Sequence, residues 1–128
     1  MKTHKLTDLV EANGITVRAV HVGTNTDDNG WRHNAWKATL VYPALQTRCT
    51  VTFSTGLAIK EPTAADVLYS LCSDARAGEV SFSEFCSEFG YDEDSRKAES
   101  IWRACKRSVG KARRFLKDDF DLFASAEH

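Results

Sequence analysis

The 128-residue sequence lacks the features that mark several special classes of protein. No stretch approaches the ~18–20 consecutive apolar residues that a membrane-spanning helix needs. The N-terminal residues Met1–Lys5 lead into no apolar run of the kind that a secretory signal contains. Because 42% of the residues are hydrophobic, a wholly disordered chain is not expected either. These observations predict one domain over residues 1–128, located in the cytoplasm and without a membrane contact.

Cysteine is sparse, and no two cysteines form a C-x-x-C pair. Without a secretory signal, reduced thiols are expected, and each lies in a pattern typical of a buried residue. The four cysteines are Cys49, Cys72, Cys86 and Cys105. The histidines are equally scattered, at His4, His21, His33 and His128. These spacings predict neither a metal site nor a bound cofactor.

One segment, residues 73–84, resembles a calcium-binding EF-hand loop at its glycine and its final glutamate. Two positions that must supply an oxygen ligand are occupied by Ala75 and Ala77, which have no ligand atom. Calcium binding is therefore not expected.

Catalytic motifs are missing as well. The sequence contains no G-x-S-x-G, no G-x-x-x-x-G-K-[ST] and no H-E-x-x-H. A non-enzymatic protein is the expectation. A small enzyme that pairs a cysteine with a histidine stays open as an alternative, because such partners meet only in the folded chain.

The first half of the chain, to about residue 60, is predicted to be mainly β. A short helix over Leu6–Asn13 precedes a strand over Ile15–Gly23, and residues 24–33 have the composition of a turn. Strands follow at residues 36–42 and 48–55, where apolar and polar side chains alternate. The short link between the last two favours an antiparallel pair and hence a three-stranded meander.

The second half, residues 61–123, is predicted to be helical, with a frayed tail at 124–128. One helix begins at Thr63–Asp66 and ends at Gly78. The next has a capping box at Ser81–Glu84 and ends at Gly90. The last begins at Asp92–Asp94 and runs to Leu116 on an apolar stripe. The predicted fold class is therefore α+β: a short N-terminal helix, a three-stranded antiparallel sheet, and three helices packed on one sheet face.

The net charge of −1 conceals a strong segregation of charge. Residues 61–94 contain nine acidic and one basic residue, whereas residues 95–117 contain nine basic and one acidic residue. At about 100° per residue, the last helix places five cations on the side opposite its apolar stripe. These are Arg96, Arg103, Arg107, Lys111 and Arg114.

Two interpretations of this basic stripe stay open: a solvated helix face, or a ridge that binds a polyanion such as nucleic acid. The acidic segment has its own alternatives, either an ordinary amphipathic surface or a surface that binds a basic groove. Trp31 and Arg32, in the loop between the first two strands, add a candidate contact. There an exposed indole would stack on a base or anchor a protein partner, and a ring folded over the sheet edge is the alternative.

Finally, the run from Phe82 to Ala98 (FSEFCSEFGYDEDSRKA), followed by Trp102 and Cys105, resembles a segment that recurs in small proteins of phages and mobile elements. With Pro62 and residues 66–68, the resemblance spans about residues 35–106. The resemblance implies a phage or mobile-element context, and in that context an inhibitor of host defence, such as an anti-CRISPR protein, is the expectation.

The leading expectation is thus a binding protein that inhibits a host defence complex, such as a CRISPR effector, by occluding a protein or nucleic-acid-binding surface. A DNA- or RNA-binding accessory protein that uses the basic stripe is the alternative. The sequence leaves the oligomeric state open.

Overall fold

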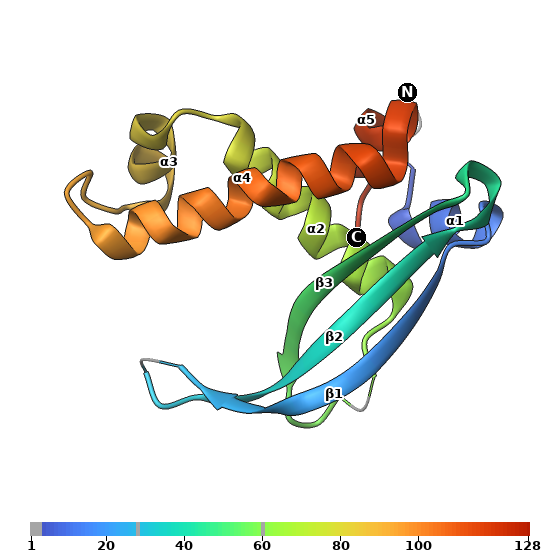
Figure 1. The fold of residues 1–128 in the computed structure, drawn as a ribbon, viewed down its shortest axis with the longest axis horizontal. Coiled ribbons are helices and arrows are strands. Elements are labelled where there is room, and N and C mark those ends of the chain that lie inside the picture. The colour runs from blue at the N-terminus through green and yellow to red at the C-terminus, as the bar shows by residue number, and fades with distance from the viewer. Residues whose placement is uncertain (1–3, 28, 60) are drawn as a thin grey trace.

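The computed structural model describes residues 4–27, 29–59 and 61–128. Residues 1–3, Asp28 of the predicted turn and Lys60 at the predicted boundary lie outside the described residues. Over the rest, the chain forms a short helix, a three-stranded antiparallel sheet and then helices, which confirms the α+β class (Figure 1). The α-helices and strands are α1 (Leu6–Ala12), β1 (Thr16–Thr26), β2 (Arg32–Tyr42), β3 (Thr47–Gly56), α2 (Ala64–Glu79), α3 (Phe82–Phe89), α4 (Arg96–Leu116) and α5 (Phe120–Ala124).

The strands pair in the order β1-β2-β3, as the predicted meander requires. The β1–β2 hairpin is longer than the sequence indicated, because Thr24–Thr26 and Arg32–His33 pair as strand rather than turn. The connection is short and built around Asp27, whose carboxylate accepts hydrogen bonds from the backbone N–H of Asn29 and Trp31. A bulge between His21 and Gly23 interrupts the register of β1.

One face of the sheet builds the main core. Ala38, Leu40 and Tyr42 of β2 are buried against α2 and the C-terminal half of α4. Trp36 of β2 is buried as well, and its indole N–H donates to the hydroxyl of Thr55 at 2.9 Å. Burial of apolar side chains at alternate positions explains why this face, and not the other, turns inward.

The helix starts differ from the expectation in two places. Thr63 and Asp66 form a complete capping box, whereas at Ser81 only the serine hydroxyl accepts, from the N–H of Glu84. The last helix begins at Arg96 and not at residues 92–94. Ser95 is its N-cap, since its hydroxyl accepts from the N–H of Ala98 at 3.1 Å. A serine hydroxyl satisfies a free N–H of the first turn directly, so it defines the start better than the acidic residues before it.

Gly78 does not end its helix. It lies buried within α2, at the point where α2 crosses α4. A Cβ atom at Gly78 would come within 2.4 Å of the backbone carbonyl carbon and oxygen of Cys105. The glycine is therefore needed for the close approach of the two helices, not for a turn.

The helix α3 packs on α4 at the end remote from α5 (Figure 1). Phe85, Cys86 and Ala98 form a second, smaller buried cluster there. Trp102 is half-buried beside this cluster. It packs beside Phe82, and its indole N–H donates to the carbonyl of Val80 at 3.1 Å.

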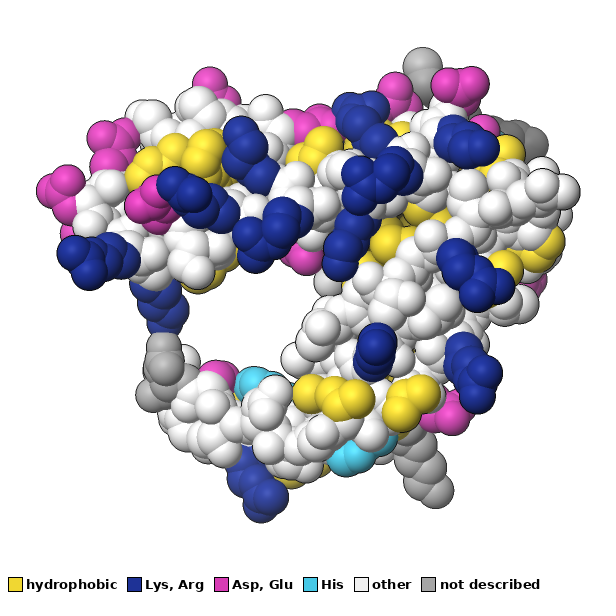
Figure 2. Space-filling view, in the orientation of Figure 1, with side chains coloured by type: hydrophobic (Ala, Val, Ile, Leu, Met, Phe, Trp, Pro, Cys, Tyr) yellow, Lys and Arg dark blue, Asp and Glu magenta, His cyan; other side chains and the backbone are white. Residues whose placement is uncertain are grey.

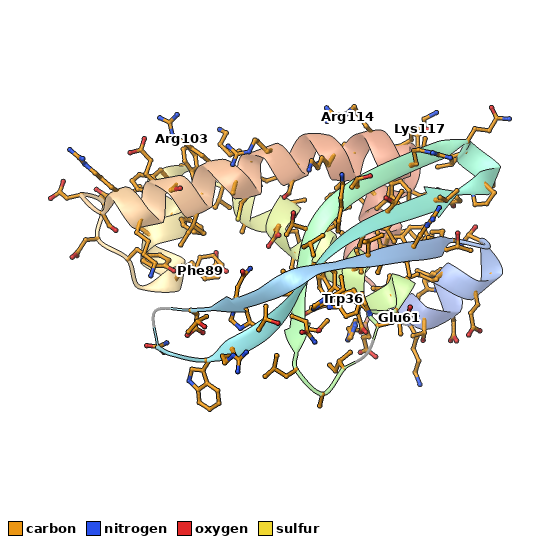
Figure 3. The ribbon with its side chains drawn as sticks, turned by 60° about the horizontal axis from the view of Figure 1, so that its bottom comes forward. Trp36, Glu61, Phe89, Arg103, Arg114 and Lys117 are labelled. Atoms are coloured by element: carbon orange, nitrogen blue, oxygen red, sulfur yellow. The ribbon has the colours of Figure 1, made fainter. Side chains whose placement is uncertain are left out.

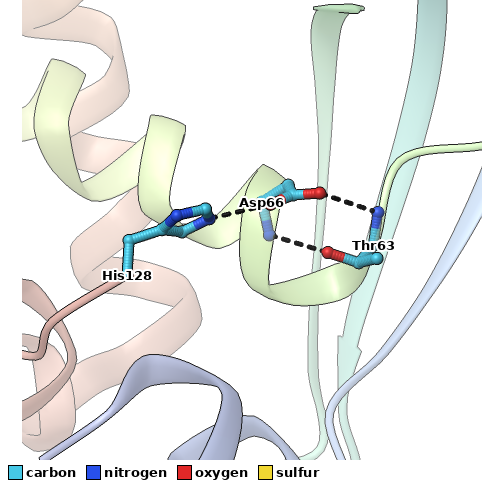
Figure 4. Close-up of polar contacts among 3 residues, drawn as sticks. All are labelled: Thr63, Asp66 and His128. Carbon is cyan, nitrogen blue, oxygen red and sulfur yellow. Dashed lines mark hydrogen bonds and ion pairs between the residues drawn. The ribbon is translucent and has the colours of Figure 1, made fainter. Parts of the chain in front are cut away.

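The C-terminal tail is not frayed. Glu127 pairs with Lys5 in a parallel bridge, accepting from the N–H of Leu6 and donating to the carbonyl of His4. Figure 4 shows the final residue, His128, whose imidazole contacts the carboxylate of Asp66 at 2.8 Å. These contacts join the two ends of the described chain through residues far apart in the sequence, which no local pattern indicates.

Tyr42 provides a pH-dependent test of the core. Its hydroxyl donates to the Asp119 carboxylate at 2.8 Å, and burial, this hydrogen bond and the negative charge of Asp119 raise its pKa from 10.0 to about 12. Because the folded-state pKa is the higher one, this contribution to stability is complete below pH 10 and is lost as the pH rises through about 12.

We expect Tyr42→Phe to lower the free energy of unfolding by about 1 kcal/mol at neutral pH. Its stability should then fall less steeply above pH 10 in denaturant titrations. Parallel curves for the two proteins would contradict the assignment.

Candidate nucleic-acid interface

All five cations of the predicted stripe lie on α4 and are exposed. Arg103 pairs with Glu99 at 2.7 Å, within the same helix. Lys111 donates to the backbone carbonyl of Thr50 at 3.2 Å. In the described part of the chain, Arg96, Arg107 and Arg114 make no hydrogen bond or ion pair. The stripe is thus a surface whose charges are largely uncompensated.

The open face of the sheet carries three further cations that the sequence analysis did not single out. By the strand register, Arg18 lies opposite Thr39, Lys37 opposite Val20 and Thr52, and Arg48 opposite Val41. All three cations are exposed. Besides these cations, the outward positions of the strands hold hydroxyl, small and aliphatic side chains together with Asn25 and His33, and no carboxylate. The alternation along each strand already indicated that these cations point outward, because each one occupies a position between the apolar residues that face the core.

The two sets of cations meet at the β3 edge. Lys111 reaches the carbonyl of Thr50 from α4. Burial raises the pKa of the Cys49 thiol on β3, and the positive charges of Lys111 and Arg114 oppose that rise. Lys111 and Arg114 therefore lie near this strand. Figure 2 shows Lys and Arg side chains along α4 and over the sheet on one face of the molecule. In Figure 3, Arg103 and Arg114 project from the side of α4 opposite to Trp36, which lies below the strands. We call this combined surface of α4 and the open sheet the basic face.

A polar cavity of about 290 Å³ lies next to the basic face, between β3, α2 and α4. Arg107 and Lys111 line it from α4, and Thr52 and Ser70 add hydroxyl groups. Asp74 stands on its far wall. Such a cavity offers hydrogen-bond donors next to the cations, a setting suited to a sugar or phosphate oxygen.

The hairpin tip is separate from the part of α4 that touches the sheet. Trp31 is 72% exposed, which excludes a ring folded over the sheet edge, and Arg32 is the first residue of β2. Figure 2 shows an open hollow between this hairpin and α4. The structure therefore brings Lys111 and Arg114 of the helix stripe next to the sheet, with Arg107 beside them at the polar cavity. Trp31 and Arg32 belong to the hairpin, which lies across the hollow from α4.

Trp31 tests whether the hairpin tip takes part in binding. We expect Trp31→Ala to change the free energy of unfolding by less than about 0.5 kcal/mol, because the ring is exposed. If the indole stacks on a base, affinity for single-stranded DNA should fall by about five- to a hundredfold. Fluorescence anisotropy with a labelled oligonucleotide measures this change. Unchanged affinity would remove the hairpin tip from the interface.

Only part of the negative charge of the acidic segment, residues 61–94, is neutralised by contacts within the described residues. Glu79 pairs with Arg113, and Asp66 contacts His128. The remaining acidic residues near α3 are exposed. The basic face and the acidic end are thus separate surfaces of one molecule.

The cysteines offer no activated thiolate. All four are buried, and desolvation raises the pKa of each thiol, in Cys72 to about 11. A nucleophilic cysteine requires the opposite shift. In the described residues no cysteine forms a hydrogen bond with a histidine.

The described residues also offer no metal site. No group of three or more His, Cys, Asp or Glu residues among them is arranged to hold a metal ion. Residues 73–79 of the calcium-loop resemblance belong to α2. Within the described residues, no helix combines the length and apolar character needed to cross a bilayer.

Comparisons of the chain with protein-family models, with curated proteins and with solved structures found no match.

Proposed function

We propose that this chain is a non-enzymatic nucleic-acid-binding protein that contacts the sugar-phosphate backbone through its basic face. The observation that carries the proposal is the meeting of two independent sets of cations, one on α4 and one on the sheet, on one side of the molecule. A solvated helix face needs no matching cations on a neighbouring sheet. Phosphate contacts of this kind contribute most of the affinity in sequence-independent binding.

The dimensions of the basic face agree with this proposal. With 21 residues at ~1.5 Å each, α4 is about 30 Å long, close to the ~34 Å of one turn of duplex DNA. Arginine predominates among its outward cations and forms bidentate contacts with phosphate. The hydroxyl groups of Thr39, Thr50 and Thr52 on the open sheet supply further donors to phosphate oxygens.

The proposal is tested by fluorescence anisotropy with labelled duplex DNA, single-stranded DNA and duplex RNA over a range of sodium chloride concentrations. If about five cations contact phosphates, the logarithm of the affinity should fall with the logarithm of the salt concentration with a slope near −4 to −5 on a duplex. The three ligands distinguish the form of nucleic acid that fits the face. Absence of binding to all three at low salt would contradict the proposal.

A second candidate is the inhibition of a host defence complex, such as a CRISPR effector, in the cytoplasm of a cell that carries a phage or mobile element. The resemblance of residues 82–98 to phage proteins motivates it. The specific structural observation in its favour is the exposed acidic end around α3, which is suited to cover a basic protein surface. Recovery of a host effector subunit in a pull-down, lost on charge reversal at that end, is the expected result.

A further inference from the structure

The end of the molecule around α3 contains a mainly apolar groove that the basic face does not include. The groove has a volume of about 230 Å³ and lies between α2, α3 and α4. Ala77 and Ile101 line it from α2 and α4, and Phe85, Phe89 and Tyr91 line it from α3 and the residues after it. We call it the α3 groove.

The aromatic rings of the groove form one cluster with an exposed edge. Phe85 is 2% exposed, and its ring centroid lies 4.8 Å from that of Phe89 and 5.8 Å from that of Tyr91. Phe89 is nevertheless 51% exposed and Tyr91 36% exposed. Figure 3 shows Phe89 at the α3 end of the molecule. Aromatic surface left open beside a groove is typical of an interface awaiting a partner.

The surroundings of the groove are strongly acidic. Residues 81–95 contain five acidic and no basic residues. All five are exposed, and none forms an ion pair within the described part of the chain. They are Glu84, Glu88, Asp92, Glu93 and Asp94. Figure 2 shows acidic side chains around α3 and the loop that leads into α4.

Asp74 adds a carboxylate on the wall of the groove itself. Asp74 is exposed and also lines the polar cavity beside Arg107 and Lys111. It has no hydrogen-bond or ion-pair partner among the described residues, and desolvation raises its pKa. A carboxylate without a hydrogen-bond or ion-pair partner is stabilised by an incoming cation. The groove therefore combines an apolar contact area with one carboxylate on the wall that it shares with the polar cavity, and five acidic residues around it.

We propose that the α3 groove docks a segment of a partner protein that carries a large apolar side chain flanked by lysine or arginine. The apolar side chain packs on Phe85, Phe89 and Ile101, and the flanking cations face Asp74 and the acidic rim. Charge complementarity selects this occupant over nucleic acid, which the acidic rim repels. The inference lies beyond nucleic-acid binding by the basic face and specifies how the second candidate function would recognise its partner.

The test uses a fluorescein-labelled synthetic peptide of about twelve residues, with one central leucine flanked on each side by lysine and arginine in a glycine–serine background. Two matched peptides replace the leucine by serine, or all basic residues by glutamate. In anisotropy titrations near physiological salt, the first peptide should bind at least about tenfold more tightly than the serine peptide, because the leucine is buried. The glutamate peptide should not bind. Equal binding of the leucine and serine peptides would overturn the proposal.

Variants of the protein locate the site. Phe89→Ser and the double variant Glu88→Lys/Glu93→Lys should each weaken peptide binding at least about tenfold. Leu122→Ser on α5, where Leu122 is 39% exposed, and Glu61→Lys are the matched controls and should leave it unchanged. The charge variants alter only exposed side chains, so they remain informative if Phe89→Ser is unstable.

The same variants separate this proposal from the proposed function. Binding of duplex DNA should be retained in Phe89→Ser, since Phe89 lies outside the basic face. If instead the protein dimerises in sedimentation equilibrium and Phe89→Ser abolishes the dimer, the groove serves a second copy and the proposal is overturned.

Discussion

The double variant Lys37→Glu/Arg48→Glu is expected to bind duplex DNA at least about thirtyfold more weakly than the native protein near 0.15 M salt. Each phosphate contact contributes a factor of about five at this salt concentration, and charge reversal adds repulsion. Both side chains are exposed on the open face of the sheet, away from the core. Anisotropy titration at several salt concentrations should also show a log–log slope less negative by about 2.

This variant discriminates between two descriptions of the interface. If α4 alone bound the nucleic acid, only Arg107→Glu/Arg114→Glu would weaken binding. If the sheet and α4 form one basic face, both double variants lose affinity to a similar extent. Lys5→Glu/Arg76→Glu, with the same change in net charge on exposed residues outside this face, is the matched control. An equal loss in the control would show that overall charge, rather than the basic face, determines binding.

Gly78→Ala is expected to lower the free energy of unfolding by more than about 2 kcal/mol. The added methyl group would lie within 2.4 Å of backbone atoms of Cys105 and 2.6 Å of the backbone nitrogen of Lys106. Backbone atoms inside a helix have no alternative rotamer, so α2 and α4 must separate and lose packing. Denaturant titration followed by circular dichroism measures the effect. A loss below about 0.5 kcal/mol would mean that the crossing is looser than described.

Gly110→Ala is the matched control, because it introduces the same methyl group within α4. There the nearest heavy atom is a terminal nitrogen of Arg114, at 2.9 Å, on a flexible and exposed side chain. The arginine side chain moves at little cost, and alanine favours a helix interior by about 0.5–1 kcal/mol over glycine. We therefore expect Gly110→Ala to raise the stability while Gly78→Ala lowers it.

The features predicted correctly are those that local periodicity determines. Alternation along β2 and β3 identified the buried face, with Ala38 and Leu40 at its centre. The 3.6-residue stripe along α4 separated Cys105 and Ala112, which are buried, from the five exposed cations. Capping chemistry located the start of α2 at Thr63.

The features that were missed depend on contacts between distant segments. Gly78 resembles a helix end in sequence, and only the position of α4 shows why it is a glycine. The contribution of Arg18, Lys37 and Arg48 to the basic face depends on which side of the sheet α4 approaches. The docking of Glu127 beside Lys5 likewise has no local signal. For the proposed basic face, the sequence analysis singled out the cations of α4 and not those of the sheet.

The bulge at His21–Gly23 has a consequence for how the protein behaves at high concentration. A three-stranded sheet has two outer strands, each with unpaired backbone groups on which another chain can add a strand. Along β3 that edge is partly occupied, because Lys111 donates to the carbonyl of Thr50. Along β1 the bulge breaks the regular spacing, and Arg18 places a charge beside it. Both outer strands are thereby poor templates for edge-to-edge growth, which disfavours aggregation of the protein through its sheet.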